Sequence, residues 1–520
     1  MLKYENMTRQ RIIIDWAWCT IVAVILVSLA STSSPLYAFN DWVDANAFLT
    51  MGKGILDGMV PYRDLFEQKG PLLYFLYSLA NLIQRDGFLG VFILEAVSLT
   101  IALHLAGRIV EMFLPARWRM LLCPLFAMLI LSSASFEAGG SAEAFCLPLI
   151  MGLLVILIGH MQQNHAKPMP SQSLFLAGLL GGLVFLIKYN LLGYWLGFAL
   201  IMLIEHIRYR RPILEARKFL WAIAGFVIAL LPTLIYFALN RALADFFDVY
   251  ILINTRQYIP DMSPGQRVLI LILAIGNGFG NNPAPGLLIL FGLWRFGRAR
   301  YLRPPALGSL ALPLMGLIQI IAIYAVGRSH VYYFFALMPL TLFGLIALAL
   351  LAEKCLSIRK FLISRPPVQT LLVVGLISAA LTLLLSPNSG LIGKSRQDYP
   401  QYVFAGIIRQ VSGATLLNYG FLDGGFYTAA GITPRFKYFM LNNIGYAQLP
   451  EMYREQARYI AERQAHFVVL RLDPEENAGE ISVPGLLENY VLVSEMTAVY
   501  RNDYRLVYNY ALYQLRQIQD

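Results

Sequence analysis

The amino-acid sequence predicts an all-α polytopic membrane protein with a small α/β domain at its C-terminal end. Two observations lead to this fold class. The chain of 520 residues is 58% hydrophobic and only 14% charged, whereas soluble domains carry roughly 25% charged residues, and its apolar residues gather in runs long enough to cross a bilayer. After about residue 385 the apolar runs become short and intermittent, as in a soluble domain.

About eleven membrane-spanning helices are expected. The first runs from Ile12 to about Ala30 behind a short basic N-terminus, with a cleaved signal peptide as the alternative, because "SLASTSS" offers small residues for cleavage. The segment 267–294 contains "GNGFGNNPAPG", which cannot form a regular helix exposed to lipid. We therefore expect a broken helix or two partial helices there. The other spans are expected at 88–113, 120–136, 144–161, 173–188, 190–205, 219–239, 307–326, 333–352 and 368–385.

The distribution of charge predicts the orientation. Alternate loops such as "EHIRYRRPILEARK" are rich in Arg and Lys, which is typical of cytoplasmic loops. The N-terminus is therefore expected in the cytoplasm and the C-terminal domain outside it. The same rule explains the net charge of +10, so we expect no nucleic-acid partner. The four cysteines show no metal-ligand spacing, and neither a disulfide framework nor a zinc site is expected.

The C-terminal segment 386–520 reads as a separate α/β domain, behind a transmembrane core of residues 1–385. "ATLLNYG" and "HFVVLRL" are typical of buried strands, and "LPEMYREQARYIAERQ" of an amphipathic helix. "YVLVSEMTAVY" and "YRLVYNYALYQL" alternate in polarity around "RND", which indicates a terminal hairpin.

The first outer loop, about residues 32–87, carries the densest polar chemistry. "DANAFLTMGKGIL" has helical periodicity and is expected to lie along the membrane interface, and "KGPLLYFLYSLANLI" is an apolar helix too short to span. Asp41 and Asp44 are three residues apart and would share a helix face. A carboxylate at this depth can act as a general base on a hydroxyl or bind a divalent cation, although an Asp near a helix start is also a common cap.

The motif D-x-x-x-F-x-x-x-G-x-x-x-x-x-G-x-x-P-Y-R-D-x-x-x-x-K-G-P-L-L-Y in this loop resembles the first external loop of GT-C glycosyltransferases. The similarity is greatest to bacterial cell-surface polysaccharide and teichoic-acid glycosyltransferases. It continues weakly in "GGSAEAFCLPL", "GRSHVYYFFALMPL" and "LLNYGFLDGGFY". The resemblance implies a GT-C-like fold, a polyprenyl-phosphate sugar as donor, and a cell-envelope glycan, lipid or protein as acceptor.

The resemblance also implies residue roles. The catalytic base of the family is an Asp of the first loop, which matches Asp44 first and Asp41 second. In the lipid A aminoarabinose transferases, which belong to the GT-C superfamily, a Lys before Pro-Pro-Leu contacts the donor phosphate. Lys69 matches this Lys, with Gly in place of the first Pro. The acid that precedes this Lys helps to bind a metal in those enzymes. Here that position is Gln68 and the acid has moved to Glu67, so dependence on a divalent cation, Mg²⁺ or Mn²⁺, stays open.

Transfer from a lipid phosphate also needs cations for the departing phosphate and groups for the acceptor. The cationic candidates are Lys69, Arg63 and Arg328. Acceptor or metal candidates are Glu143, Glu67 and His330. Each has an ordinary alternative: an acid at a helix start for Glu143, and an aromatic belt with a snorkelling Arg for the segment "GRSHVYYF".

Three hypotheses for function follow. The first is a glycosyltransferase that moves a sugar by an inverting single displacement on the outer face of the membrane. The second is a flippase or transporter of lipid-linked sugars, which would carry paired half-repeats and ionisable groups along a path. The third is a non-catalytic subunit of wall-polymer assembly, in which Asp44 would be dispensable. The first-loop motif favours the first hypothesis, and the sequence identifies neither the sugar nor the acceptor.

Overall fold

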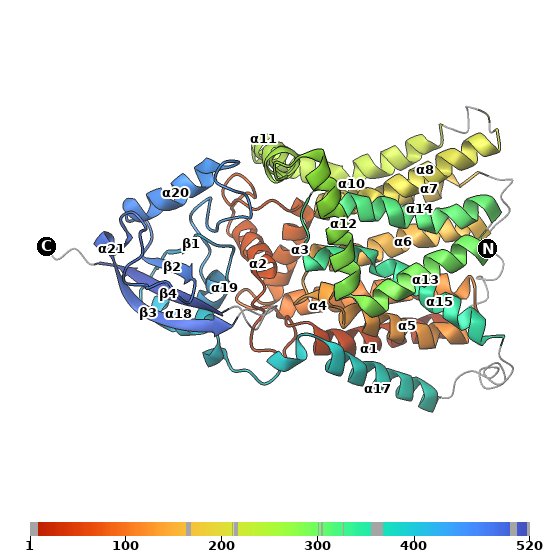
Figure 1. Ribbon diagram of the computed structural model, residues 1–520, viewed down its shortest axis with the longest axis horizontal. Coiled ribbons are helices and arrows are strands. Elements are labelled where there is room, and N and C mark those ends of the chain that lie inside the picture. The colour runs from red at the N-terminus through yellow and green to blue at the C-terminus, as the bar shows by residue number, and fades with distance from the viewer. Residues whose placement is uncertain are drawn as a thin grey trace. The chain divides into compact units, whose positions relative to one another are not determined.

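The computed structural model describes residues 9–162, 168–210, 212, 217–299, 301–302, 305–325, 327–354, 368–499 and 507–516 (Figure 1). The chain divides into two compact units. The helical unit comprises Met1–Ser31, Phe92–Pro232 and Asp261–Gly390, and the sheet unit comprises Thr32–Val91, Thr233–Pro260 and Leu391–Asp520. The first outer loop thus packs into one unit with the C-terminal segment. The domain boundary expected after residue 385 from composition stays a prediction.

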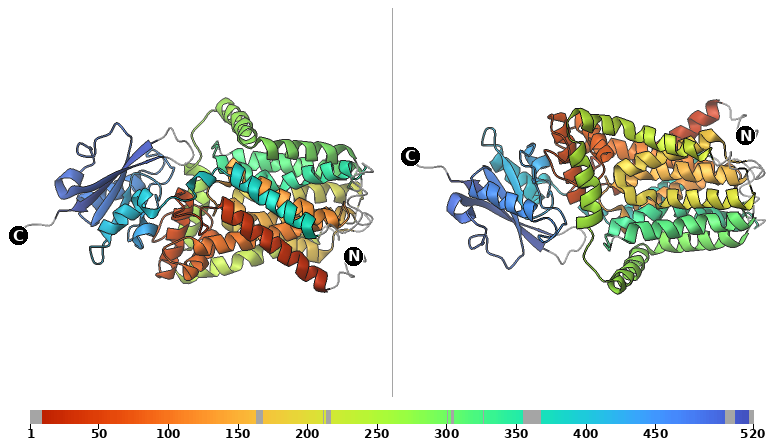
Figure 2. Two further views of the ribbon diagram at one scale, coloured as in Figure 1. Left: turned by 90° about the horizontal axis from the view of Figure 1, so that it is seen from below. Right: turned by 90° about the horizontal axis from the view of Figure 1, so that it is seen from above.

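Most helices of the helical unit run side by side, whereas α12 runs across the direction of the others (Figures 1 and 2). Every predicted span contains a helix, as expected for a multi-pass membrane protein. The helices are α1 (Arg9–Ala30), α4 (Leu89–Glu111), α5 (Arg117–Leu131), η1 (Ala134–Phe136), α6 (Ala142–Gln162), α7 (Ser171–Lys188), η2 (Tyr189–Leu192), α8 (Gly193–Arg208), α10 (Phe219–Leu239), α12 (Pro264–Asn281), α13 (Pro283–Ala299), α14 (Pro305–Tyr324), η4 (Val331–Leu340), α15 (Thr341–Ala352) and α17 (Val368–Leu385).

Seven helices in the described part of the chain are long and apolar enough to cross a membrane, judged by length and composition. This count is below the eleven expected for two reasons. Ser171–Arg208 counts as one helix, although η2 divides it into α7 and α8. In addition, α5, α12, α13 and α17 fall outside the count. The polytopic helical fold is as predicted, and the side of the membrane that each terminus faces stays a prediction.

The predicted break in 267–294 lies at Asn282, between α12 and α13. Pro283 begins α13, and a proline cannot donate the backbone hydrogen bond that would continue α12. The Asn282 amide donates to the carbonyl of Gly278 at 2.9 Å and accepts from the backbone N–H of Ser135 at 3.1 Å. The polar side chain at the break therefore finds both of these partners within the helical unit, as polar groups at membrane depth require.

The sheet unit contains the predicted C-terminal α/β fold. The strand order is β1-β2-β4-β3, with β1 and β2 parallel and the other pairs antiparallel. The connection from β1 to β2 carries α20, because parallel neighbours need a crossover. The turn of the hairpin, residues 501–503, lies outside the described residues. The elements are α2 (Val43–Leu56), α3 (Pro71–Ile83), α11 (Leu243–Phe246), η3 (Phe247–Gln257), α18 (Pro400–Ile408), β1 (Leu416–Tyr419), α19 (Phe426–Ala430), α20 (Pro450–Ala461), β2 (Phe467–Leu472), α21 (Leu486–Asn489), β3 (Tyr490–Val499) and β4 (Val507–Leu515).

The two helices predicted in the first outer loop are α2 and α3, and they pack closely. A Cβ on Gly52 of α2 would lie 2.6 Å from the backbone carbon of Tyr77 in α3, so only glycine allows this approach. Asn81 donates across the pair to the carbonyl of Leu49 at 3.0 Å. All residues from Ala45 to Gly54 are buried, so α2 is covered on every side instead of showing the single buried face of an interfacial helix.

Candidate functional site

The N-terminal end of α2 carries the first candidate, Asp44. The helix begins at Val43, and Asp44 lies in its first turn, where the helix dipole stabilises a negative charge. Asp41 precedes the helix, so the two aspartates do not share a helix face, contrary to the expectation from their spacing. The structure therefore gives Asp44 a fixed helical position and leaves Asp41 in the preceding segment.

The ammonium of Lys69 lies between two carboxylates of the first loop. Its Nζ is 3.6 Å from Oδ2 of Asp44 and 3.8 Å from Oε1 of Glu67. The side chains of Lys69, Asp44 and Glu67 are 16%, 14% and 4% exposed, and the ring of Phe48 lies 5.5 Å from Nζ. Three predicted site residues thus meet in one partly buried cluster, where charges interact more strongly than in water.

Two tyrosines hold the backbone of Lys69. The hydroxyl of Tyr62 donates to the carbonyl of Lys69 at 2.6 Å, and the hydroxyl of Tyr74 shares its one proton between this carbonyl, at 3.0 Å, and Glu67. Glu67 accepts from the backbone N–H of Lys69 at 2.7 Å and from the Tyr74 hydroxyl. Burial raises the pKa of both tyrosines well above the ordinary value, which keeps the hydroxyls protonated as donors. Both tyrosines belong to the first-loop motif, but their role in holding Lys69 was not predicted from the sequence.

The conformation around Lys69 is unusual in two ways. Tyr62 is fully buried and has φ of +71°, a region that side chains other than glycine rarely adopt and that concentrates at functional sites. Lys69 itself directly precedes Gly70, the N-cap of α3, and Pro71 is at the first turn. A lysine next to a helix N-terminus is a suitable environment for a phosphate, because the helix dipole and the ammonium act in the same direction.

Arg63 makes its contacts away from this cluster. Its guanidinium donates to both carboxylate oxygens of Asp64, at 2.8 and 2.7 Å, and to the carbonyl of Asn240 at 2.9 Å. The hydrogen bonds from Arg63 hold the pKa of Asp64 below its ordinary value. The adjacent acid thus balances the charge of Arg63, which is 41% exposed.

A second cluster forms within the helical unit around Lys188, at the end of α7. Its Nζ lies 2.5 Å from Oε1 of Glu143 in the first turn of α6, and the two side chains are 8% and 2% exposed. Nζ also lies 4.8 and 4.5 Å from the ring centroids of Tyr332 and Tyr333. The imidazole of His330 stacks on Tyr332, with centroids 5.4 Å apart.

This cluster unites two of the predicted residues, Glu143 and His330, around a lysine whose role the sequence left undecided. Arg328 lies two residues before His330, in the segment between α14 and η4. Tyr333 and the rest of η4 up to Leu340 are buried, whereas the described residues 327–332 are half-buried or exposed, so the aromatic-belt interpretation of this segment stays open.

The fit of a divalent cation can be tested on the donor atoms. Within the described ranges, no group of three or more His, Cys, Asp or Glu side chains is arranged to hold a metal ion. The two carboxylates of the first-loop cluster, Asp44 and Glu67, both face the Lys69 ammonium. The two carboxylates are therefore arranged as ion-pair partners of Lys69 and not as a cluster of metal ligands. Dependence on a divalent cation stays a prediction.

The comparisons with known proteins concern the fold. No family model matches the sequence, and no curated protein does. Among solved structures, ArnT from Cupriavidus metallidurans bound to undecaprenyl phosphate is similar, with a TM-score of 0.60, 14% identity, and coverage of 97% of this chain and 98% of that one. The apo state of the same protein gives a TM-score of 0.56 at 14% identity, with coverage of 89% and 93%. The chain therefore has the polytopic helical fold of ArnT with a small C-terminal α/β region.

Proposed function

We propose that this protein is an integral membrane glycosyltransferase that moves a sugar from a polyprenyl-phosphate donor to a cell-envelope acceptor on the outer face of the membrane. The observation that carries the proposal is the Asp44–Lys69 pair, 3.6 Å apart, at the N-termini of two helices in a chain with the ArnT fold. The solved ArnT holds undecaprenyl phosphate, which supports a lipid-linked donor. The acceptor is a glycan such as a polysaccharide or teichoic acid, or else a lipid or protein.

The proposed reaction is an inverting single displacement. The carboxylate of Asp44 takes the proton from an acceptor hydroxyl as its oxygen attacks the anomeric carbon, and Asp41 is the second candidate for this role. The bond from that carbon to the phosphate oxygen breaks, and the electron pair leaves with the polyprenyl phosphate. Lys69 and the N-terminus of α3 stabilise the departing charge. A fixed cation in a poorly hydrated site is worth about 3–4 kcal/mol of barrier by analogy with oxyanion holes.

The remaining candidates take supporting roles. Arg328 is proposed to add positive potential for the donor, and Glu143 and His330 to bind the acceptor. Arg63, whose charge Asp64 balances, is proposed to offer the donor phosphate hydrogen bonds. Glu67 is proposed to orient Lys69, through the hydrogen bond from the lysine backbone. Glu67 is also the residue proposed to bind a divalent cation. A cation requirement would be established if a chelator abolishes activity and added Mg²⁺ or Mn²⁺ restores it.

The central experiment is sugar transfer by membranes or purified protein, with a polyprenyl-phosphate sugar and extracted envelope material. Removing a general base lowers rates by about 10²–10⁴-fold, so we expect Asp44→Asn to lose at least a hundredfold while the protein still inserts and folds. Asp41→Asn separates the two candidates, and Asp248→Asn, an exposed acid in the same unit, is the matched control. Full activity of Asp44→Asn would remove the assigned base, and loss with Asp41→Asn alone would transfer the role.

Lys69→Met tests the phosphate role. It keeps the length of the side chain but removes its charge, so kcat is expected to fall more than the affinity for the acceptor. Unchanged kinetics would argue against a phosphate contact. Movement of lipid-linked sugar across proteoliposomes without any transfer would instead support the transporter hypothesis.

A further inference from the structure

The sheet unit contains a groove that the proposed reaction does not use. Its volume is about 520 Å³, and its lining includes Asp57, Arg409, Ser412, Thr433 and Arg435. Ligand sites are typically about 300–1,000 Å³, so the groove has room for a segment of a few linked sugars. It lies between the C-terminal end of α2, the segment after α18 and the turn after α19.

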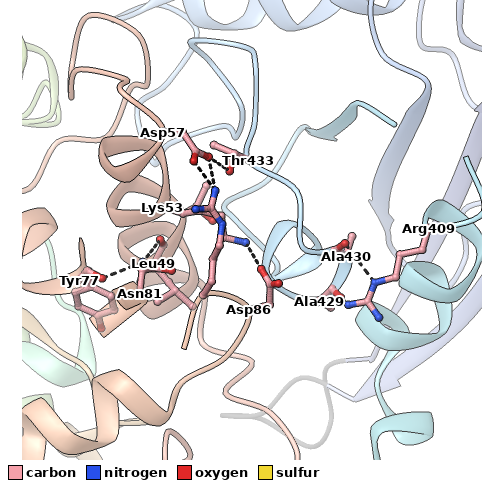
Figure 3. A network of polar contacts seen from close by, with 12 residues as sticks. Leu49, Lys53, Asp57, Tyr77, Asn81, Asp86, Arg409, Ala429, Ala430 and Thr433 are labelled. Atoms are coloured by element: carbon pink, nitrogen blue, oxygen red, sulfur yellow. Dashed lines mark hydrogen bonds and ion pairs between the residues drawn. The ribbon is translucent and has the colours of Figure 1, made fainter. Parts of the chain in front are cut away.

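One wall of the groove is a fixed arginine. Arg409 caps α18 and donates to the carbonyls of Ala429 and Ala430 at 2.5 and 3.3 Å (Figure 3). A guanidinium has five N–H donors, and these two bonds occupy one on Nε and one on Nη2. The side chain is therefore held in place by α19 and retains donors for a ligand.

The negative charge in the lining is already paired. Both carboxylate oxygens of Asp57 accept from Arg85 at 2.5 Å, and Thr433 donates to Asp57 at 2.6 Å (Figure 3). Although burial opposes it, hydrogen bonding from Arg85 and Thr433 holds the pKa of Asp57 below its ordinary value. The charge that a ligand meets is thus the positive charge of Arg409 and Arg435.

The other lining groups suit a saccharide. Ser412 offers a hydroxyl. Gly413 has φ of +66°, and a Cβ added to it would meet no atom within 4 Å, so a ligand can approach the backbone there. The described lining contains no aromatic ring on which the face of a neutral sugar could pack. Recognition at this groove must therefore rely on charge and hydrogen bonds.

We propose that the groove binds an anionic saccharide segment of the acceptor, held through its carboxylate or phosphodiester groups by Arg409 and Arg435. This inference rests on the proposed function and names its acceptor class. Helix α2 connects the two sites, because Asp44 lies in its first turn and Asp57 is its C-cap. At 1.5 Å per residue the helix sets them about 20 Å apart, so an oligosaccharide can occupy the groove while its growing end reaches Asp44.

The test measures the equilibrium binding of end-labelled oligomers to the full chain in detergent or nanodiscs, without donor. Binding is detected by the fluorescence anisotropy of the label. The probes are a glycerol-phosphate oligomer, an oligogalacturonate and a maltooligosaccharide of equal length. Two solvent-accessible arginine contacts, worth about threefold each, predict about tenfold tighter binding of an anionic oligomer than of the neutral one. The two anionic arms distinguish phosphodiester from carboxylate, and added salt should weaken binding.

Variants make the test specific. Arg435→Ala should weaken binding of the anionic oligomer about threefold or more, while Arg454→Ala, an exposed arginine on α20 outside the groove, should not change it. Ser412→Trp fills the groove without altering charge and should abolish binding. Equal affinity for all three oligomers, no binding of any, or binding unaffected by both Arg435→Ala and Ser412→Trp would overturn the proposal. Because no donor is present, full transfer activity of Asp44→Asn, which would remove the assigned base, leaves this result unaffected, and the two proposals fail separately.

Discussion

Asp423 couples the first outer loop to the C-terminal segment, and its substitution gives a prediction that can be worked out in numbers. Its side chain is fully buried and accepts hydrogen bonds from Thr50 of α2 at 2.6 Å and from the backbone N–H of Gly425 at 2.8 Å. Burial raises its pKa from 3.8 to about 6, against the lowering effect of these bonds and of Lys53. The folded protein therefore disfavours the charged form of this carboxyl.

The sign of the pH dependence follows from this shift. Below pH 3.8 the carboxyl is protonated in both the folded and the unfolded state and has no effect. As the pH rises towards about 6, the unfolded state loses its proton first, so stability falls. Above that pH the full cost is present, about 3 kcal/mol at about 1.4 kcal/mol per pH unit. About half of it, roughly 1.4 kcal/mol, develops between pH 5 and pH 8.

Asp423→Asn removes this titration and keeps one of the two oxygens, so it can still accept from Thr50 or from Gly425, which bond to different oxygens of the carboxylate. We expect the variant to lose about 1.4 kcal/mol of pH-dependent destabilisation between pH 5 and pH 8, or roughly 3–6 °C in melting temperature for a unit of this size. The assay is thermal unfolding of the full chain in detergent at both pH values, followed by tryptophan fluorescence. Asp473→Asn, an exposed acid of the same unit, is the control. An equal difference in melting temperature between the two pH values for Asp423→Asn and wild type would show that Asp423 does not cause the pH dependence.

Two further predictions concern stability and use the same unfolding measurement. Gly52→Ala should lower the free energy of unfolding by about 1–3 kcal/mol, since its Cβ would lie 2.6 Å from the backbone carbon of Tyr77. The control is Gly406→Ala, which should not destabilise because its Cβ would meet no atom within 4 Å. Equal melting temperatures of the two variants would contradict the close packing of α2 and α3. Lys188→Met should cost about 3–5 kcal/mol because it leaves Glu143 buried without this partner, and adding Glu143→Leu to Lys188→Met should recover most of the loss. An unstable double variant would show that the pair does more than neutralise itself.

The elements with strong local patterns could be predicted from the sequence. The apolar runs of the helical unit, the strands "LLNY" and "FVVLRL", the terminal pair of strands and the amphipathic α20 all carry their own periodicity, and the structure confirms them. The loop helices α2 and α3 were also predicted. The burial of α2 on all sides could not be predicted, because its covering comes from α3 and from the C-terminal segment, as the contact between Thr50 and Asp423, 373 positions apart, shows.

The candidate site was predictable to the extent that its residues share one loop. Asp44, Glu67 and Lys69 stand in a recognisable motif, and the structure brings them together. Tyr62 and Tyr74 stand at fixed positions of the same motif, but the sequence gave them no role, because an aromatic residue beside an apolar run is typical of core packing. The pairing of Arg63 with Asp64 was visible in principle, since the two are adjacent and an arginine next to an acid is partly neutralised before any substrate arrives.

Rigidity of α2 gives the two proposed sites a fixed relation. Its middle is locked to α3 by the Gly52–Tyr77 approach and to the C-terminal segment by the Thr50–Asp423 hydrogen bond. Close-packed elements with bonded polar groups do not deform gradually, so Asp44 and the groove at Asp57 cannot change their separation without breaking one of these contacts. A base on one end of a rigid helix and an anchoring groove at the other would fix which hydroxyl of a long acceptor reaches the reacting carbon, because the anchored part sets the register of the chain. Positioning of this kind lowers the entropic part of a barrier, and in the proposed reaction it would give the C-terminal segment a part in catalysis without a catalytic residue of its own.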